Sequence, residues 1–209
     1  MKPILFNTPM VQAILDGRKT QTRRLIKPQP LFFTGRNYIF ADETCPKKWE
    51  DCNNFVATAP YQPGDILYIR ETWAQIGTDV DKIYFEEPDK LYDGMYIYKA
   101  DGINLSDIGH WHPSIHMPKE AARIFLRVTN VRVERLQEID DEGAKREGAN
   151  FGAGVDEKMR RTAIERFAEI FDSTIKPADR DRYSWDANPW VWVYEFEQIS
   201  ESEIYKNDT

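Results

Sequence analysis

The chain has two cysteines and three histidines in 209 residues, and it has no long apolar run. So few cysteines exclude a disulfide framework, and we expect Cys45 and Cys52 to be free thiols in a reducing compartment. A membrane-spanning helix needs about 20 consecutive apolar residues. The N-terminus has only Ile4, Leu5 and Phe6 in a row, which is too short for the core of a signal peptide. These features predict a cytoplasmic protein with no membrane partner.

Basic residues are outnumbered by acidic ones, and the net charge is −7. That balance argues against non-specific binding along a phosphate backbone. The charge is unevenly distributed, since residues 1–36 hold seven basic residues and one acidic residue, whereas residues 37–109 hold six and fourteen. A basic island in an acidic protein favours a localised anionic or nucleotide-like ligand over a long nucleic-acid track.

The pattern of short segments predicts one α+β domain over residues 1–209. Thr8 as N-cap, Pro9 in the first turn and Gly17 after the end predict a first helix over residues 9–16. Several short strands that lack a βαβ rhythm predict a small mixed β-barrel with peripheral helices. A short strand is expected at 4–6, a turn that runs into a strand at 18–26, and further strands at 66–74, 95–100, 122–136 and 190–199. In the last of these, Val191, Val193 and Phe196 are expected to alternate with polar positions. Two further helices are expected at 156–172 and at 140–147, the latter with Asp140 as N-cap and Gly148 at its end.

One strand carries a carboxylate onto an apolar face. Leu67, Ile69, Glu71 and Trp73 alternate along the chain and therefore share one side of the expected strand. A carboxylate at such a position needs a cation or strong hydrogen bonds. Glu71 is therefore either half of a structural ion pair, with an arginine of the basic island, or an acid–base or substrate-holding group in a pocket.

The basic island contains the pattern Gly-x-Lys-x-x-Thr-x-Arg at Gly17, Lys19, Thr22 and Arg24. This pattern, placed just after the first helix, resembles the ASCH domain family, which has a PUA-like β-barrel fold. A second match is Gly64-Asp65 followed by a strand that ends in Arg70-Glu71-Thr72-Trp73. The resemblance is closest to phage- and prophage-encoded members, and the segments at about 31–60 and 137–175 then count as insertions.

The resemblance implies a nucleoside-like ligand or RNA or another single-stranded nucleic acid. Some small bacterial members are amidohydrolases that remove an acyl group from the exocyclic amine of N4-acetylcytidine. They use a lysine, a threonine three residues later and a glutamate on a following strand, and Lys19, Thr22 and Glu71 fit these positions. Other members are regarded as RNA-binding modules. A non-catalytic RNA- or DNA-binding module and a phage-associated structural protein therefore stay open beside the hydrolase. Neither a cofactor nor an oligomeric state is predicted.

The residue types suit amide hydrolysis. A threonine hydroxyl is a weak nucleophile until a base takes its proton, and a neutral lysine can be that base. Arginines next to Lys19 would lower its pKa by repulsion between like charges. Glu71 would orient the amine or protonate the leaving group, and Arg24 would hold a carbonyl oxygen or an anionic group of the ligand. In an ideal strand Lys19 and Thr22 lie on opposite faces, so the pair requires a turn or bulge near residues 20–21.

All three histidines lie between Gly109 and Pro118. Their spacing, also when combined with the cysteines, matches no standard zinc site, so we predict no metal. Ser114 and His116 are expected at the mouth of a pocket. Trp73 and Trp111 are either packed in the core or stacked on a base. The candidate ligand-binding residues are Gly17, Arg24, Arg70, Trp73, Ser114 and His116.

Overall fold

The computed structural model describes residues 1–30, 32–33, 38–39, 56–77, 94–104, 109–149 and 162–204. The chain divides into two compact units, which are described separately. The first contains residues 1–17, 66–127 and 198–209, and the second contains residues 18–65 and 128–197. The prediction of one domain over residues 1–209, with insertions at about 31–60 and 137–175, stays a prediction.

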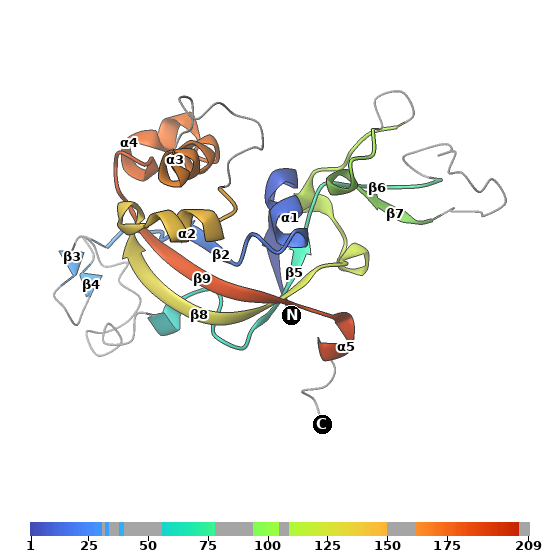
Figure 1. Cartoon of the computed structure of the whole chain (residues 1–209), viewed down its shortest axis with the longest axis horizontal. Coiled ribbons are helices and arrows are strands. Elements are labelled where there is room, and N and C mark those ends of the chain that lie inside the picture. Colours follow the sequence, from blue (N-terminus) through green and yellow to red (C-terminus); the bar gives the residue numbers. More distant parts are fainter. Residues whose placement is uncertain are drawn as a thin grey trace. The chain divides into compact units, whose positions relative to one another are not determined.

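The strands confirm a mixed α+β class but give no barrel within the described residues. Five strands form one sheet in the order β1-β5-β8-β9-β2 (Figure 1). The sheet is open, because its outer strands β1 and β2 are not neighbours. In this part of the chain the sheet is therefore not closed into the expected small mixed β-barrel. Its strands are β1 (Lys2–Leu5), β2 (Gln21–Leu25), β5 (Ile66–Arg70), β8 (Phe125–Arg135) and β9 (Trp190–Ile199).

In the first unit, β1 pairs in parallel with β5, and β5 pairs antiparallel with the start of β8. A separate two-stranded sheet joins β6 (Trp73–Gln75) to β7 (Tyr96–Tyr98). The strand expected over residues 66–74 is thus broken at Glu71 and Thr72. The short helices of this unit are η2 (Lys99–Asp101), η3 (Ser114–His116), η4 (Lys119–Ala121) and α5 (Glu201–Ile204).

The first helix, α1 (Thr8–Leu15), begins one residue earlier than expected. Its N-cap is Asn7, whose side chain accepts a hydrogen bond from the backbone N–H of Met10 at 3.1 Å. Asn7 takes the capping role predicted for Thr8, because Thr8 is already helical. Gly17 follows with φ of +71°, a left-handed conformation that glycine adopts without strain and that ends the helix as predicted.

In the second unit, β2 pairs antiparallel with β9, and Thr22 lies opposite Tyr194. β3 (Phe32–Phe33) pairs with β4 (Tyr38–Ile39). Two helices, α2 (Asp141–Arg146) and α3 (Ala163–Ser173), pack against each other (Figure 1). Asp140 caps α2 as predicted. The remaining helices are η5 (Leu136–Glu138), η7 (Pro177–Asp179) and α4 (Arg180–Tyr183).

The core of the second unit lies between these helices and β9. Phe167 and Phe171 form the apolar stripe of α3 and pack with Val191 and Val193 of β9. The expected inside–outside alternation along β9 is wrong, because Trp190, Trp192 and Tyr194 are buried as well. Residues 156–161 of the helix predicted at 156–172 lie outside the described residues. In the described ranges no helix is both long enough and apolar enough to cross a bilayer.

Candidate functional site

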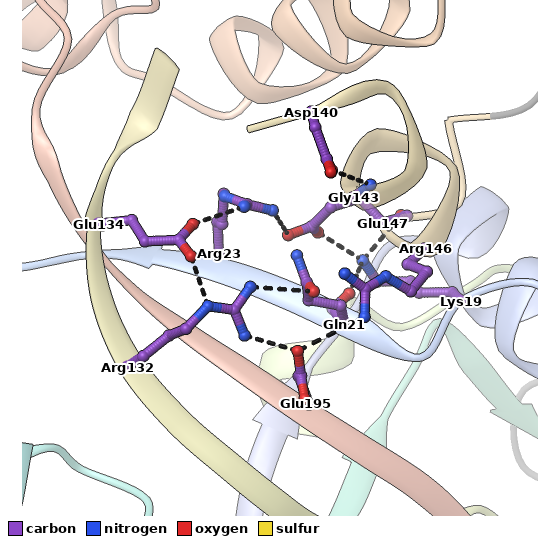
Figure 2. Close-up of polar contacts among 10 residues, drawn as sticks. All are labelled: Lys19, Gln21, Arg23, Arg132, Glu134, Asp140, Gly143, Arg146, Glu147 and Glu195. Carbon is purple, nitrogen blue, oxygen red and sulfur yellow. Dashed lines mark hydrogen bonds and ion pairs between the residues drawn. The ribbon is translucent and has the colours of Figure 1, made fainter. Parts of the chain in front are cut away.

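Lys19 lies in the loop before β2 and is almost completely buried, at 3% exposure. Its ammonium group donates three hydrogen bonds: to the backbone oxygen of Gln21 at 2.8 Å, to the backbone oxygen of Glu147 at 2.8 Å and to Oε2 of Glu147 at 2.9 Å (Figure 2). An ammonium group has three N–H donors, so each has an acceptor. Glu147 is the residue directly after α2 and is also buried, at 4%.

Burial lowers the pKa of Lys19 below its usual value, because the charged form loses its hydration. The Glu147 carboxylate opposes this shift, whereas Arg24 and Arg23 add to it through like-charge repulsion. The neighbouring arginines therefore lower the pKa of Lys19, as predicted, but desolvation lowers it more.

Thr22 is the second residue of β2 and is buried. Since β2 begins only at Gln21, Lys19 lies outside the regular strand, and strict alternation does not force it to the opposite face from Thr22. The carbonyl group that Lys19 contacts belongs to Gln21, the residue directly before Thr22. The convergence of Lys19 and Thr22 stays a prediction.

A polar network extends from Lys19 along the second unit (Figure 2). Arg23 donates to Glu147 Oε1 at 3.2 Å and to Glu134 Oε2 at 2.8 Å. Glu134 in turn accepts a hydrogen bond from Nε of Arg132. Arg132 also donates to Glu195 Oε1 at 2.6 Å and to Gln21 Oε1 at 3.4 Å. Arg146 forms an ion pair with Glu195 at 3.5 Å.

Arg24 lies in β2 beside two tyrosines. Burial lowers the pKa of its guanidinium, and Tyr61, Glu147 and Tyr194 oppose that shift. The rings of Tyr61 and Tyr194 meet edge to face, with centroids 5.1 Å apart. Arg24 and this tyrosine pair thus influence one another electrostatically.

Glu71 belongs to the first unit and is 1% exposed. Its carboxylate accepts two hydrogen bonds from Arg123, with Nε to Oε1 at 3.0 Å and NH2 to Oε2 at 3.1 Å. The expected ion pair exists, but its arginine comes from the segment before β8 and not from the basic island. Arg123 also contacts Asp101 at 2.8 Å and lies 3.9 Å from the centre of the Tyr98 ring.

Burial raises the pKa of Glu71 above its usual value, and the pairing with Arg123 only partly offsets this. Burial also raises the pKa of the Tyr98 hydroxyl to about 12. That hydroxyl donates to the backbone oxygen of Ala121 at 2.6 Å. Burial thus shifts the pKa values of Glu71 and Tyr98 in the same direction, upward.

Arg70 contacts Met117, the residue directly after η3, which carries Ser114 and His116. Nε of Arg70 donates to the backbone oxygen of Met117 at 2.9 Å. The N–H of Met117 donates to the backbone oxygen of Ser114 at 3.2 Å, so the helix Ser114–His116 is held beside β5. The N–H of Glu71 also points to the sulfur of Met117, at 3.2 Å. Arg70 and Glu71 are thereby connected to the segment that carries Ser114 and His116.

Trp73, which follows Arg70 and Glu71 in the chain, contacts His112 and Tyr96. It exchanges backbone hydrogen bonds with His112, at 3.3 and 2.8 Å. Its ring lies 4.8 Å from the His112 ring and 5.6 Å from the Tyr96 ring. The indole Nε1 is buried and has no hydrogen-bond acceptor among the described residues. Trp111, in contrast, packs against the small core of Ala74, Ile76 and Ile97, which agrees with the packing alternative.

The predicted site residues are thus divided between the units. The first unit contains Gly17, Arg70, Glu71, Trp73, Ser114 and His116, and the second contains Lys19, Thr22 and Arg24. Sequence reasoning did not find Glu147 or Arg123, the ionic partners of Lys19 and Glu71. Within the described ranges no cluster of three or more histidine, cysteine, aspartate or glutamate side chains could hold a metal ion. Cys45 and Cys52 lie outside those ranges.

Comparison of the chain with models of protein families, with curated proteins and with solved structures finds no match.

Proposed function

We propose that the chain binds a nucleobase or nucleoside through residues of the Gly17–Arg24 segment. The proposal is supported by the resemblance of this segment to the ASCH family pattern. It includes the finer expectation that the fold is PUA-like, and that the chain is closest to phage-encoded members.

The observation that carries the proposal is the identity of the buried polar residues. Among the described residues, six polar or charged side chains are buried, and Lys19, Thr22 and Glu71 are three of them. The others are Gln21, Arg23 and Glu147. Buried charges are costly unless they are paired and hydrogen-bonded, and apolar residues often replace them without loss of stability. Packing alone therefore gives no reason for these residue types, whereas a polar ligand does.

Aromatic donors give the proposal a second support. The Trp73 ring has a buried N–H that lacks an acceptor among the described residues, beside the ring of His112. Arg24 lies next to the tyrosine pair Tyr61 and Tyr194 in the other unit. Nucleobases offer both ring faces for stacking and carbonyl or ring-nitrogen acceptors for such donors.

The binding proposal is tested by a thermal-shift screen of the full chain against free bases, nucleosides and acylated nucleosides. Ligands that bind only the folded state raise the melting temperature as their concentration increases. We expect stabilisation by at least one pyrimidine compound, and a much smaller effect in a Thr22→Val variant. Stabilisation by a single-stranded oligonucleotide alone, weakening as salt rises, would instead favour the non-catalytic nucleic-acid-binding module. No stabilisation by any compound would favour a phage-associated structural protein.

Amide hydrolysis is a second candidate function, and the pKa directions favour it. A general base needs a lowered pKa and a general acid a raised one, and burial shifts Lys19 and Glu71 in these directions. In its neutral form, after the ammonium has released a proton, Lys19 would take the proton of Thr22, or of a water that Thr22 positions. Attack on the acyl carbon forms a new C–O bond, and cleavage of the C–N bond releases the nucleoside amine. If water attacks, the acyl group leaves as the free acid; if Thr22 attacks, the acyl group remains as an ester on Thr22, which a water molecule then hydrolyses. The proton held by Lys19 would pass to that amine, and Arg24 would stabilise the carbonyl oxygen. The role predicted for Glu71, which belongs to the first unit, stays a prediction.

The hydrolysis is tested by following deacylation of N4-acetylcytidine chromatographically. The variants are Lys19→Ala, Thr22→Ala and Glu71→Ala, each checked for folding by circular dichroism. Loss of turnover in all three folded variants supports the assignment. Equal turnover in the Thr22→Ala protein would remove Thr22 from the mechanism, and no turnover by the wild-type protein would leave binding as the function.

A further inference from the structure

Figure 2 shows the polar contacts of the network in the second unit. The exposed fractions of its side chains show one buried end and one end that reaches solvent. At the buried end the side chains of Lys19 and Arg23 are each 2% exposed. At the other end the side chains of Arg132, Arg146 and Glu195 are 31%, 41% and 28% exposed. Gln21 lies between these ends and is fully buried. A ligand that approaches from solvent therefore meets two arginines first and Gln21 behind them.

The polar atoms of this network that lack a partner are all donors. They are Nε2 of Gln21, Nε of Arg23 and Nε of Arg146, each buried and without an acceptor in the described part of the chain. A buried donor that makes no hydrogen bond loses its hydration without compensation. The network therefore lacks acceptors, and a group that supplies several acceptors at once would complete it.

The charges of the network are also unbalanced. Its cations are Lys19, Arg23, Arg132 and Arg146, and its carboxylates are Glu134, Glu147 and Glu195, so one positive charge is left over. Arg132 uses three of its nitrogens on Glu134, Glu195 and Gln21. The guanidinium of Arg146, by contrast, has only a long contact with Glu195 at 3.5 Å among the described residues.

An acceptor-rich anion satisfies these donors better than water does. A water molecule brings two hydrogens of its own, which need acceptors that the network does not have in excess. A phosphate group brings several acceptor oxygens and negative charge, and arginine recognises it through paired N–H donors. We propose that Arg146, Gln21 and Arg132 form a site for a phosphate group of the ligand. This inference deepens the proposed nucleoside binding and rests on it, because it makes the ligand a nucleotide or a nucleic-acid phosphate.

Glu195 competes with a phosphate group for the same two arginines. It lies opposite Gln21 in the pairing of β2 with β9, and its Oε1 is shared by Arg132 and Arg146. A phosphate on these arginines displaces or repels the Glu195 carboxylate, so Glu195 weakens binding. Removal of its charge tightens phosphate binding, which is the opposite of what damage to the fold would do.

The site is tested by isothermal calorimetry of the full chain with four probes at constant ionic strength. The probes are inorganic phosphate, cytidine, cytidine 5′-monophosphate and a short single-stranded oligocytidylate. We expect saturable phosphate binding, and we expect the monophosphate to bind about tenfold or more tightly than cytidine, as a charge-assisted contact contributes. A higher affinity for the oligonucleotide than for the monophosphate would identify a phosphodiester as the natural source.

Variants separate this site from general electrostatic attraction. Arg146→Gln loses the preference for the monophosphate over cytidine, and Glu195→Gln increases it. Lys145→Gln is the matched control, because it removes one positive charge from the neighbouring, similarly exposed position. That control changes the preference less than about twofold, as expected for a surface charge.

The outcomes distinguish this site from the function on which it rests. Cytidine binding without any preference for the monophosphate overturns the phosphate site and leaves the proposed nucleoside binding intact. Equal losses in Arg146→Gln and Lys145→Gln also overturn it, since they show attraction by net charge alone. Phosphate binding that depends on Arg146 while no nucleoside compound binds overturns the proposed function and leaves an anion site.

Discussion

The ammonium of Lys19 donates to the carboxylate of Glu147 at 2.9 Å, and both side chains are nearly excluded from solvent. The same carboxylate accepts from Arg23 through its other oxygen, at 3.2 Å. One glutamate therefore neutralises two buried cations and connects the end of α2 to the start of β2. The position of Lys19, and with it the proposed site in the second unit, depends on this contact.

Replacement of Glu147 by alanine is expected to destabilise the protein strongly. It leaves the charges of Lys19 and Arg23 buried without their carboxylate, which costs about 3–5 kcal/mol in comparable sites. Urea unfolding measures the change. The control is Glu142→Ala on the same helix, whose side chain is 69% exposed, and which should change stability by less than about 0.5 kcal/mol. Similar small changes in both variants would contradict the assigned role of Glu147.

The sequence largely predicts helix α2, but it does not predict the ion pair between Glu147, which follows the helix, and Lys19. Asp140 as N-cap and Gly148 after the end predicted the helix, and Asp140 does accept from the N–H of Gly143 at 2.6 Å. Glu147 looked like an ordinary charge at a helix end. Its contact with Lys19 joins residues 128 positions apart, and no local pattern encodes such a pairing.

Glycine at position 143 is expected to be required, although alanine is the better helix former. A Cβ at this position would lie 2.8 Å from Oδ1 of Asp140 and 3.2 Å from a side-chain carbon of Ile139. Gly143→Ala therefore disturbs the N-cap, whose loss costs about 1 kcal/mol. The loss of the N-cap therefore equals or exceeds the stabilisation of about 0.5–1 kcal/mol that alanine gives over glycine inside a helix. Thermal unfolding should show a lower melting temperature.

The matched test of that explanation is the same substitution in an Asp140→Gly background. The crowding atom and the cap are then both absent, so the added alanine should be neutral or stabilising. A loss of stability of the same size in both backgrounds would show that Asp140 is not the cause.

Arg123 and Glu71 are expected to be energetically coupled. Arg123→Met leaves the Glu71 carboxyl buried without its two hydrogen bonds, whereas Glu71→Gln keeps a neutral polar group there. A double-mutant cycle with these two substitutions should give a coupling free energy of about 0.5–3 kcal/mol. Asp101→Asn is the control, because Asp101 contacts the same arginine but is 37% exposed. It should cost less than about 1 kcal/mol, and additive effects of Arg123→Met and Glu71→Gln would contradict the coupling.

The sequence predicts correctly that Glu71 lies on a buried face. It predicts neither the ion pair with Arg123 nor the interruption of the strand at residues 71–72. Leu67 and Ile69 are buried as their alternation predicts. No glycine or proline marks the interruption at residues 71–72, because the cause is tertiary: Arg70 and Glu71 bond to Met117. In β9 the expected alternation of buried and exposed residues is wrong for a different reason. The uninterrupted apolar run Trp190–Tyr194 already indicated burial on both faces, which the assumption of alternation missed.

The raised pKa of Glu71 predicts a specific dependence of stability on pH. Its folded-state pKa lies above the unfolded value of about 4.5, so the folded protein binds more protons between these two values. The contribution of Glu71 to stability is therefore fully present below pH 4.5 and is lost as the pH rises through the folded-state pKa. Glu71→Gln cannot titrate and should lack this loss.

The measurement is the difference in unfolding free energy between wild type and Glu71→Gln, taken by urea titration at a series of pH values from 4 upward. Wild type should lose stability relative to the variant as the pH rises. A difference that changes in the other direction would show that the attraction of Arg123 outweighs burial and that the pKa of Glu71 is lowered.

Nucleoside binding is tested most directly by calorimetric titration of the folded full-length chain with N4-acetylcytidine. We expect saturable binding at one site per chain, which is lost in Lys19→Met and Thr22→Val and retained in Lys145→Gln. The absence of binding by the wild-type chain, or binding unchanged by both Lys19→Met and Thr22→Val, would contradict it.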